Sequence, residues 1–375
     1  MKKLSTLQFC AIEYFLILAN NVGLTTYILF HYAKQDGLLS IILGSIIGII
    51  PLLTYLKIMN TKPELNIFEK IEEKFKTTGK ILNIILVIAV AFFTATNYNN
   101  LIDFISSQYL SKTPQIIIAL SFLPAIIYIL TKGTTVIGRT VFILLIISAT
   151  LVFLTIIGLI WQIKIDNILP ILENGIKQPI ICSFIYVIYN ITPLFLLTII
   201  PKNEILDKEK FNKRVIITYI IANIIIFIIF FLTLSVLGTN LANLYQYPEY
   251  DVLKKVSLIG FIERTESTIS LRWTFYVFAV TIMGILFITK YLKFTFKIKN
   301  DKTNKKITII ISLIIVLWGK FIFQESSKFN KFTYTKLPLL IAIILILIPL
   351  LITKKVKNKS LHHSINNKTS DTSNN

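Results

Sequence analysis

The sequence has few of the residues on which metal sites, disulfides and most enzymatic mechanisms depend. It contains two cysteines and three histidines among 375 residues. Cys10 and Cys182 both fall in apolar stretches, and His362 and His363 belong to a polar tail, so no metal-ligand spacing or disulfide framework emerges. The connections between apolar stretches contain no phosphate-binding loop and no serine–histidine–aspartate set. We therefore expect no enzymatic activity, no metal and no cofactor.

Acidic residues are also scarce. The 19 Asp and Glu residues stand against 39 Lys and Arg, which gives a net charge of +20. In a soluble protein, such an excess of positive charge would first suggest a nucleic-acid partner. Here the basic residues cluster in short segments between long apolar stretches, which is the pattern that orients membrane proteins. We therefore expect contact with membrane lipid and no nucleic acid.

Apolar residues dominate the chain. They make up 54% of it, and the mean hydropathy is +0.72. Because a bilayer is crossed by about twenty apolar residues in a helix, we expect an all-α polytopic membrane protein with ten transmembrane helices in one domain, residues 1–359. Residues 360–375, rich in Asn and Ser, are expected to form a disordered cytoplasmic tail. The expected spans are residues 7–32, 38–59, 81–110, 115–131, 136–161, 180–200, 215–237, 269–292, 307–323 and 337–353.

The distribution of basic residues predicts the orientation of these spans. If the N-terminus is cytoplasmic, 27 of the 39 Lys and Arg residues fall in segments on the cytoplasmic side. This asymmetry follows the positive-inside rule and favours an even number of spans with both termini in the cytoplasm.

Two of the expected spans are interrupted by polar and helix-breaking residues. The first contains Asn20, Asn21 and Gly23 near its middle, and the sixth contains Tyr189-Asn190-Ile191-Thr192-Pro193. Irregular backbone is tolerated at membrane depth only where it is buried in protein or lines a cavity. Breaks at corresponding positions of two halves indicate a transporter-type site near the bilayer midplane and a 5+5 inverted repeat. A kink packed against a neighbouring helix would explain the first break equally well.

The two breaks supply the candidate ligand-binding residues. Half-helix N-termini attract a carboxylate, and free carbonyl groups attract an ammonium group. Asn97 belongs to a polar run at residues 94–100 that either lines a cavity or ends near the outer interface. The candidate ligand contacts are Asn20, Gly23, Thr25, Asn97, Tyr189, Asn190, Thr192 and Tyr276.

Glu13 is a carboxyl group within the first expected span. An ionised side chain is costly at that depth unless it is protonated or faces the protein interior. Glu13 is therefore either a proton site or a hydrogen-bonded structural carboxyl.

The stretch between the seventh and eighth spans ends in a cluster of charges. Apolar residues recur at helical spacing over Leu253–Ile262, which predicts an interfacial helix over the outer mouth of the bundle. Glu263, Arg264 and Glu266 follow directly, and they either contact a partner subunit or form an ion-paired helix cap.

The same stretch resembles one known family. The order Tyr247-Pro248-Glu249-Tyr250, Glu263-Arg264-Thr265-Glu266 and Trp273 is similar to a pattern of the B subunits of spore germinant receptors, in the amino acid–polyamine–organocation transporter superfamily. Leu4-Ser5-Thr6-Leu7-Gln8 is similar to the opening of that family. Gly133 to Arg139 also matches it, except that Thr135 replaces a usual acidic residue.

The resemblance implies a fold and a role. The fold would be two five-helix inverted repeats with the substrate between broken spans one and six. The role would be nutrient sensing, for example of amino acids, in the inner membrane of a spore, together with a receptor A subunit and a lipoprotein C subunit. The alternatives are a proton-coupled amino acid transporter, with Glu13 as the titratable group, and a structural scaffold for a receptor complex.

Overall fold

The computed structural model describes residues 3–173, 175–254 and 266–322, together with residues 340, 344, 347 and 348; for residues 266–268 and 319–322 it describes the backbone alone. In this part of the chain the regular elements are helices, apart from an isolated parallel bridge between Leu4 and Ile205. Among the described residues, eight helical segments are long and apolar enough to cross a membrane. The expectation of an all-α polytopic membrane protein is confirmed, and the count of ten spans stays a prediction.

The first two spans are each built from more than one helical piece. The first runs from Thr6 to Tyr32 and contains α1 (Thr6–Leu18), the π-helical turn η1 (Asn21–Thr25) and α2 (Thr26–Tyr32). The second runs from Lys34 to Asn60. It consists of the 3₁₀ turn η2 (Lys34–Asp36), α3 (Gly37–Ile47) and α4 (Ile49–Asn60).

The other elements follow in chain order. They are α5 (Ile67–Phe75), α6 (Thr77–Gln108), α7 (Gln115–Lys132), α8 (Thr134–Ile160), η3 (Ile165–Ile168), α9 (Lys177–Ile191), η4 (Thr192–Ile199), η5 (Lys202–Glu204), η6 (Lys208–Lys210), α10 (Phe211–Leu244), α11 (Pro248–Lys254), α12 (Glu266–Thr295) and α13 (Asp301–Ile322). Of the expected tenth span, only residues 340, 344, 347 and 348 are described.

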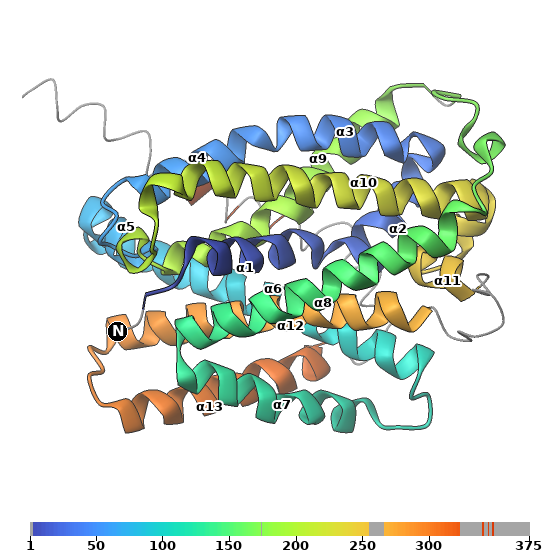
Figure 1. Ribbon diagram of the computed structural model, residues 1–375. Helices are drawn as coiled ribbons and strands as arrows, with labels where there is room; N and C mark the ends of the chain where they lie inside the picture. The colour runs from blue at the N-terminus through green and yellow to red at the C-terminus, as the bar shows by residue number, and fades with distance from the viewer. Residues whose placement is uncertain are drawn as a thin grey trace, which may run out of the picture.

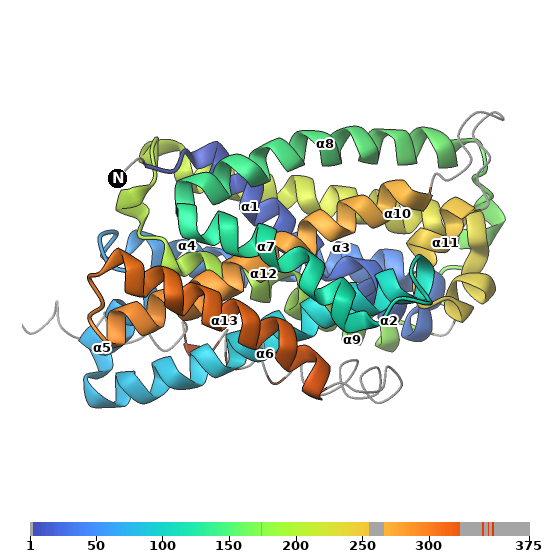
Figure 2. The same cartoon turned by 90° about the horizontal axis from the view of Figure 1, so that it is seen from below.

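Three spans form the centre of the bundle (Figures 1 and 2). Of the most apolar residues of each span, 83% are buried in Thr6–Tyr32, 72% in Lys177–Ile199 and 78% in Ile269–Thr295. In the peripheral span Thr134–Ile160 the value is 28%. Around this centre, α3 packs on α9, α6 packs on α12, and α7 and α13 lie side by side at one edge. The two interrupted spans are therefore both central, where neighbouring helices can satisfy their backbone groups.

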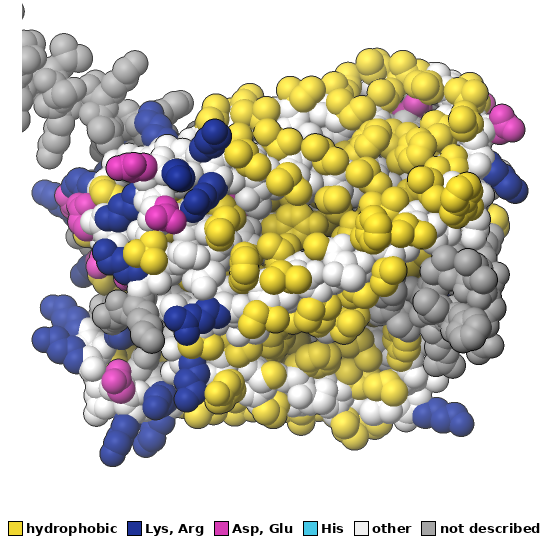
Figure 3. Space-filling model, viewed as in Figure 1, with side chains coloured by type: hydrophobic (Ala, Val, Ile, Leu, Met, Phe, Trp, Pro, Cys, Tyr) yellow, Lys and Arg dark blue, Asp and Glu magenta, His cyan; other side chains and the backbone are white. Residues whose placement is uncertain are grey.

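The surface has the character of a membrane protein (Figure 3). Apolar side chains such as Ile50, Ile143 and Phe153 are exposed along the middle of the helices, because lipid rather than water is their natural neighbour. Lys and Arg side chains gather at one end, here called the basic end, where the N-terminus and α5 lie. The opposite end holds η3 and α11.

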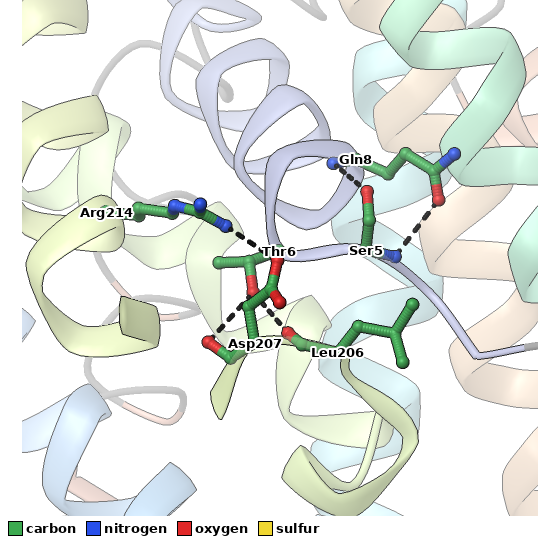
Figure 4. Close-up of polar contacts among 6 residues, drawn as sticks. All are labelled: Ser5, Thr6, Gln8, Leu206, Asp207 and Arg214. Atoms are coloured by element: carbon green, nitrogen blue, oxygen red, sulfur yellow. Dashed lines mark hydrogen bonds and ion pairs between the residues drawn. The ribbon is translucent and has the colours of Figure 1, made fainter. Parts of the chain in front are cut away.

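Hydrogen bonds at the basic end tie the start of α1 to the segment before α10 (Figure 4). The Leu206 amide donates to the Leu4 carbonyl at 2.8 Å, and the Thr6 hydroxyl donates to the Leu206 carbonyl. Arg214 pairs with Asp207 at 3.2 Å. The first span therefore enters the bundle in a fixed position at this end.

The helix α11 differs from the interfacial helix that the sequence predicts. It begins at Pro248, before the expected Leu253 start, and its residues Glu249, Tyr250 and Val252 are buried in the bundle. The remainder of the expected helix lies outside the described residues.

Candidate ligand-binding site at the break in the first span

The first span is broken at Val22 and Gly23. Val22 is extended (φ −67°, ψ 126°), and Gly23 is left-handed (φ 70°, ψ −1°). The backbone amide and the hydroxyl of Thr25 both donate to the Asn20 carbonyl, at 3.0 and 2.9 Å. Glycine suits this position for two reasons: its φ is rarely adopted by other residues, and a Cβ here would lie 2.4 Å from the Tyr247 ring.

The sixth span changes from an α-helix to a 3₁₀ helix at Thr192. There α9 gives way to the 3₁₀ helix η4, whose second residue is Pro193. Proline has no backbone N–H and obstructs the preceding turn, so a regular α-helix does not continue through it.

The two breaks contact each other inside the bundle. The Asn20 side-chain amide donates to the Tyr189 carbonyl at 2.8 Å, and the Asn21 amide donates to Asn190 Oδ1 at 3.1 Å. Further buried polar atoms in this junction have no hydrogen-bond partner among the described residues, namely Asn20 Oδ1, Asn190 Nδ2 and Thr192 Oγ1. These atoms therefore lack the partners that buried polar groups nearly always have.

A cavity lies on the other side of the first break, between η1 and the helices α10, α11 and α12. It holds about 420 Å³ not filled by protein atoms, part of it open to the outside. Most of its walls are apolar, and polar groups enter at a few points, as in small-molecule sites generally. The lining residues are Leu18, Asn21, Val22, Thr26, Ile225, Ile226, Ile229, Phe230, Glu249, Ile269, Arg272, Trp273 and Tyr276.

Glu249 brings a carboxyl group from α11 to this cavity. The residue is 1% exposed, and its Oε2 has no hydrogen-bond partner in the described structure. Burial raises the pKa of Glu249 from 4.5 to about 7, although hydrogen bonds from Thr26 and the Gly23 backbone act in the opposite direction. Desolvation of the carboxylate therefore outweighs the contacts that favour its charge.

Arg272 brings a positive charge to the same cavity from α12. It is 5% exposed, and its Nε has no hydrogen-bond partner in the described part of the chain. Nearby, the Tyr276 hydroxyl and Ser148 form a hydrogen bond of 2.6 Å, and the rings of Tyr276 and Tyr14 are 6.4 Å apart. The ion pairs found in the described residues include neither Glu249 nor Arg272.

Aromatic side chains pack beside the cavity at the end opposite the basic end. The Phe104 ring meets Tyr247, Tyr250 and Trp273 edge-on, at centroid distances of 4.8, 5.2 and 4.9 Å. The Trp273 indole donates to the Ala19 carbonyl at 2.9 Å, so it also satisfies a carbonyl group next to the break. This cluster fixes α11 and α12 against the first span.

The structure brings some of the sequence-predicted residues together and separates others. Asn20, Tyr189, Asn190 and Thr192 meet at the junction, whereas Gly23 and Thr25 shape the first break. Tyr276 lines the cavity. Asn97 does not line it, and its side chain bonds to the Phe93 carbonyl of its own helix.

The other predicted residues lie apart from the cavity or outside the described part. Glu13 is fully buried in α1, and neither of its oxygens has a described partner. Glu263 and Arg264 lie outside the described residues, and Glu266 begins α12 with an undescribed side chain. No cluster of His, Cys, Asp or Glu suited to a metal ion occurs among the residues described.

Sequence reasoning missed Glu249 and undervalued Arg272. Glu249 follows Pro248 in a connection between spans, where an acidic residue is usually solvated. The sequence contained one signal of its burial. Glu249 lies between two large aromatic residues, Tyr247 and Tyr250. Arg272 belongs to the eighth expected span, and its burial depends on how α12 packs against the first span.

The raised pKa of Glu249 predicts a pH-dependent effect of Glu249→Gln on stability. Because folding raises this pKa from 4.5 to about 7, the folded state loses stability as pH rises through that interval, by about 3 kcal/mol in all. The variant should melt at a higher temperature than wild type above pH 7, and the difference should disappear near pH 4.5. Melting of the purified protein in detergent tests this, with the exposed Glu209→Gln as control. A pH-independent difference would contradict it.

The packing of Gly23 predicts that Gly23→Ala is strongly destabilising. The left-handed backbone alone costs about 1–2 kcal/mol for alanine, and the Tyr247 ring adds a steric clash at 2.4 Å. Gly175→Ala is the matched control, because Gly175 has φ +78° and no described atom within 4 Å of the added Cβ. Gly23→Ala should lower the melting temperature considerably more than Gly175→Ala. Equal losses would show that the clash with Tyr247 is relieved at no cost.

Comparison with known proteins agrees with this architecture. Residues 3–329 match the family model described as spore germination protein. Putative spore germination protein YfkT of Bacillus subtilis (strain 168) is 26% identical over 330 residues, which cover 88% of this chain and 89% of YfkT. Spore germination protein XB of Bacillus anthracis is 24% identical over 314 residues, covering 80% of this chain and 85% of XB. Spore germination protein A2 of Bacillus subtilis (strain 168) is 24% identical over 290 residues, covering 76% of this chain and 77% of A2.

The family match covers most of the chain, including both breaks, α11 and the start of α12. The resemblance seen in the sequence is therefore confirmed at the level of the family, and the chain belongs to the spore germination protein family.

Proposed function

We propose that this integral membrane protein is the nutrient-sensing subunit of a spore germinant receptor, and that it binds a small nutrient such as an amino acid near the bilayer midplane. Membership of the spore germination protein family supports a role in germination. The observation that carries the solute-binding part is the junction of the two breaks, where buried polar atoms lack partners beside a cavity. Discontinuous helices of this kind commonly form solute sites in membrane transport proteins.

Ligand binding would act by changing the relative stability of two arrangements of the bundle. A solute shifts such an equilibrium only as far as it binds one arrangement more tightly. The Asn20–Tyr189 and Asn21–Asn190 hydrogen bonds join two central spans, so a solute that competes for these groups would favour a different packing of α1 against α9.

The signal would pass to partner subunits, which we expect to be a receptor A subunit and a lipoprotein C subunit. Glu263, Arg264 and Glu266 stay our proposed contacts to them, on the argument from sequence alone. The proposed location is the spore inner membrane with both termini cytoplasmic. The concentration of Lys and Arg at the basic end, beside the N-terminus, supports this orientation.

Asn190→Ala tests the sensing site. The substitution removes the acceptor of the Asn21 amide and a free buried donor, at a cost of about 1 kcal/mol in stability. Spores that lack the chain should lose the germination response to one nutrient of a panel of single amino acids and salts. Spores restored with Asn190→Ala at normal protein levels should respond only at a higher half-maximal concentration of that nutrient.

Asn223→Ala provides the matched control. Asn223 is also buried, but it accepts hydrogen bonds from Ser45 and Tyr186, which belong to neither break. It should alter protein level or stability without changing the half-maximal concentration. If both variants shift that concentration equally, or if the deletion leaves germination intact, the receptor proposal fails.

Glu13 favours a second candidate function, proton-coupled amino acid transport. A fully buried carboxyl with both oxygens unpartnered in the described structure is suited to take up and release a proton when its surroundings change. Tyr55 is near this group, and its hydroxyl likewise has no described partner.

Glu13→Gln separates the two functions. If the protein is a receptor without proton coupling, the variant should germinate normally, because a neutral amide can replace a neutral acid in shape. If it is a transporter, amino acid uptake into proteoliposomes should depend on the proton gradient and should be lost in Glu13→Gln. The measurement is uptake with and without a protonophore. Gradient-dependent uptake by the wild-type protein would favour transport over sensing alone.

A further inference from the structure

The connection between α8 and α9 carries an apolar surface at the end of the bundle opposite the basic end (Figure 1). Its exposed apolar side chains include Trp161, Leu169, Ile171 and Ile176, which are 88%, 56%, 57% and 57% exposed. These four side chains are here called the apolar edge. Large apolar side chains left open in this way mark a surface that lipid or a protein covers.

Polar groups of the same connection point into the protein. The Gln35 side-chain amide donates to the Pro170 carbonyl at 2.8 Å, and the Leu172 amide donates to Asp36 Oδ1 at 2.8 Å. Gln35 and Asp36 are 6% and 3% exposed, and they lie in η2 at the start of the second span. A connection that faced water would turn its apolar side chains inward and its polar groups outward. Because the arrangement over residues 169–172 is the reverse, their outer side suits an apolar surrounding.

A second set of hydrogen bonds fixes the connection to the seventh span. The Lys164 backbone amide and the Asn167 side chain both donate to the Ser235 carbonyl, at 3.1 and 2.8 Å. Ser235 lies just before the break of α10 at Gly238 (φ 70°, ψ 165°). Carbonyl groups at the end of a helical stretch need donors from outside it. The connection is therefore held against the bundle at two points, η2 and α10.

The length of α8 places Trp161 at the level of the outer bilayer surface. Gly138, near the start of α8, packs against Leu4 at the basic end, and the exposed Arg139 follows it. Trp161 comes 22 residues after Arg139. That separation is about 33 Å along an α-helix, close to the roughly 30 Å of the hydrocarbon core. Arg139 and Trp161 therefore fall at opposite interfaces, where basic and tryptophan side chains are favoured.

The charges in the connection favour lipid over a protein partner. Two basic and two acidic side chains are exposed there, namely Lys164, Asp166, Glu173 and Lys177. The core of a protein–protein interface is depleted in charged residues. At the level of the lipid headgroups, by contrast, apolar side chains reach the acyl chains while charged groups stay in contact with water and headgroups.

We propose that the connection between α8 and α9 is a membrane-interface anchor, with the apolar edge inserted among the headgroups and upper acyl chains of the outer leaflet. Through Gln35, Asp36 and Ser235, the anchor holds the start of the second span and the break of α10 at a fixed depth in the bilayer. The partner is the lipid surface itself, and the inference does not depend on the proposed nutrient-sensing function.

Quenching of Trp161 fluorescence by lipid tests the anchor. The purified full-length chain and Trp161→Phe are placed in nanodiscs of phosphatidylcholine and phosphatidylglycerol, with or without bromine atoms near the headgroup end of the acyl chains. The fluorescence that Trp161→Phe lacks belongs to Trp161, so Trp273 can stay in place as the donor to the Ala19 carbonyl. This difference signal should fall about twofold in brominated lipid, and aqueous iodide should quench it about threefold less than free tryptophan.

Two further variants in the Trp161→Phe background test the rest of the connection. Ile171→Trp moves the reporter away from the end of α8, and brominated lipid should quench it as it quenches Trp161. Lys299→Trp is the control, because Lys299 is exposed in the turn between α12 and α13 at the basic end. Iodide should quench this control more strongly than it quenches Trp161, and brominated lipid should quench it less.

Two results would overturn the proposal. Trp161 could be quenched by iodide like free tryptophan and not by brominated lipid. The apolar edge would then face water in the isolated chain, as expected of a docking surface for a protein. Alternatively, lipid could quench Trp161 while Ile171→Trp behaves like Lys299→Trp. In that case only the end of α8 would reach the bilayer, and the connection would not be an anchor.

Discussion

The interruption of the first span is the constraint on which the rest of the structure depends. A helix that stops within a membrane exposes backbone groups, and the bilayer core offers no water to satisfy them. Here protein groups take that role: the Trp273 indole bonds to the Ala19 carbonyl, and Thr25 bonds to the Asn20 carbonyl. The broken span must therefore be central, and its neighbours must bring polar side chains to it. For this reason the junction with the sixth span, the aromatic cluster and α11 all lie around the break in the first span.

The polar groups around this break are the basis of our proposal that the protein binds a solute. An apolar bundle would be more easily stabilised without Glu249 or Arg272, because each carries a desolvation cost into the protein. The aromatic contacts of Phe104 with Tyr247, Tyr250 and Trp273 hold α11 in place, so Glu249 is presented from a rigid element rather than from a loop.

Much of the architecture follows from local sequence signals. Long apolar runs give the helical fold, and the pairing of Asn with Gly or Pro marks both interruptions, because these residues act on the backbone of their own segment. The contact between Asn20 and Tyr189 joins residues distant in sequence, and it was anticipated only because breaks in transporter-like halves tend to meet. Glu249 could not be placed in the same way. Its burial depends on how α11 packs against the aromatic cluster. This helix has only seven residues, too few for a hydrophobic periodicity to indicate which side is buried. For Asn97 the ligand contact stays a prediction; in the structure its side-chain amide donates to the Phe93 carbonyl of its own helix.

The most direct measurement is solute protection of a cysteine at the first break. Cys10 and Cys182 are replaced by serine, and Val22, which lines the cavity, becomes the only cysteine through Val22→Cys. A membrane-impermeant thiol reagent is applied to the reconstituted protein with and without the nutrient whose response the deletion removes, and Ile165→Cys in the exposed turn η3 serves as control. Our account predicts that the reagent labels Val22→Cys and that the nutrient slows this labelling but not that of Ile165→Cys. Labelling of Val22→Cys at the same rate with and without the nutrient would contradict a solute site at the break.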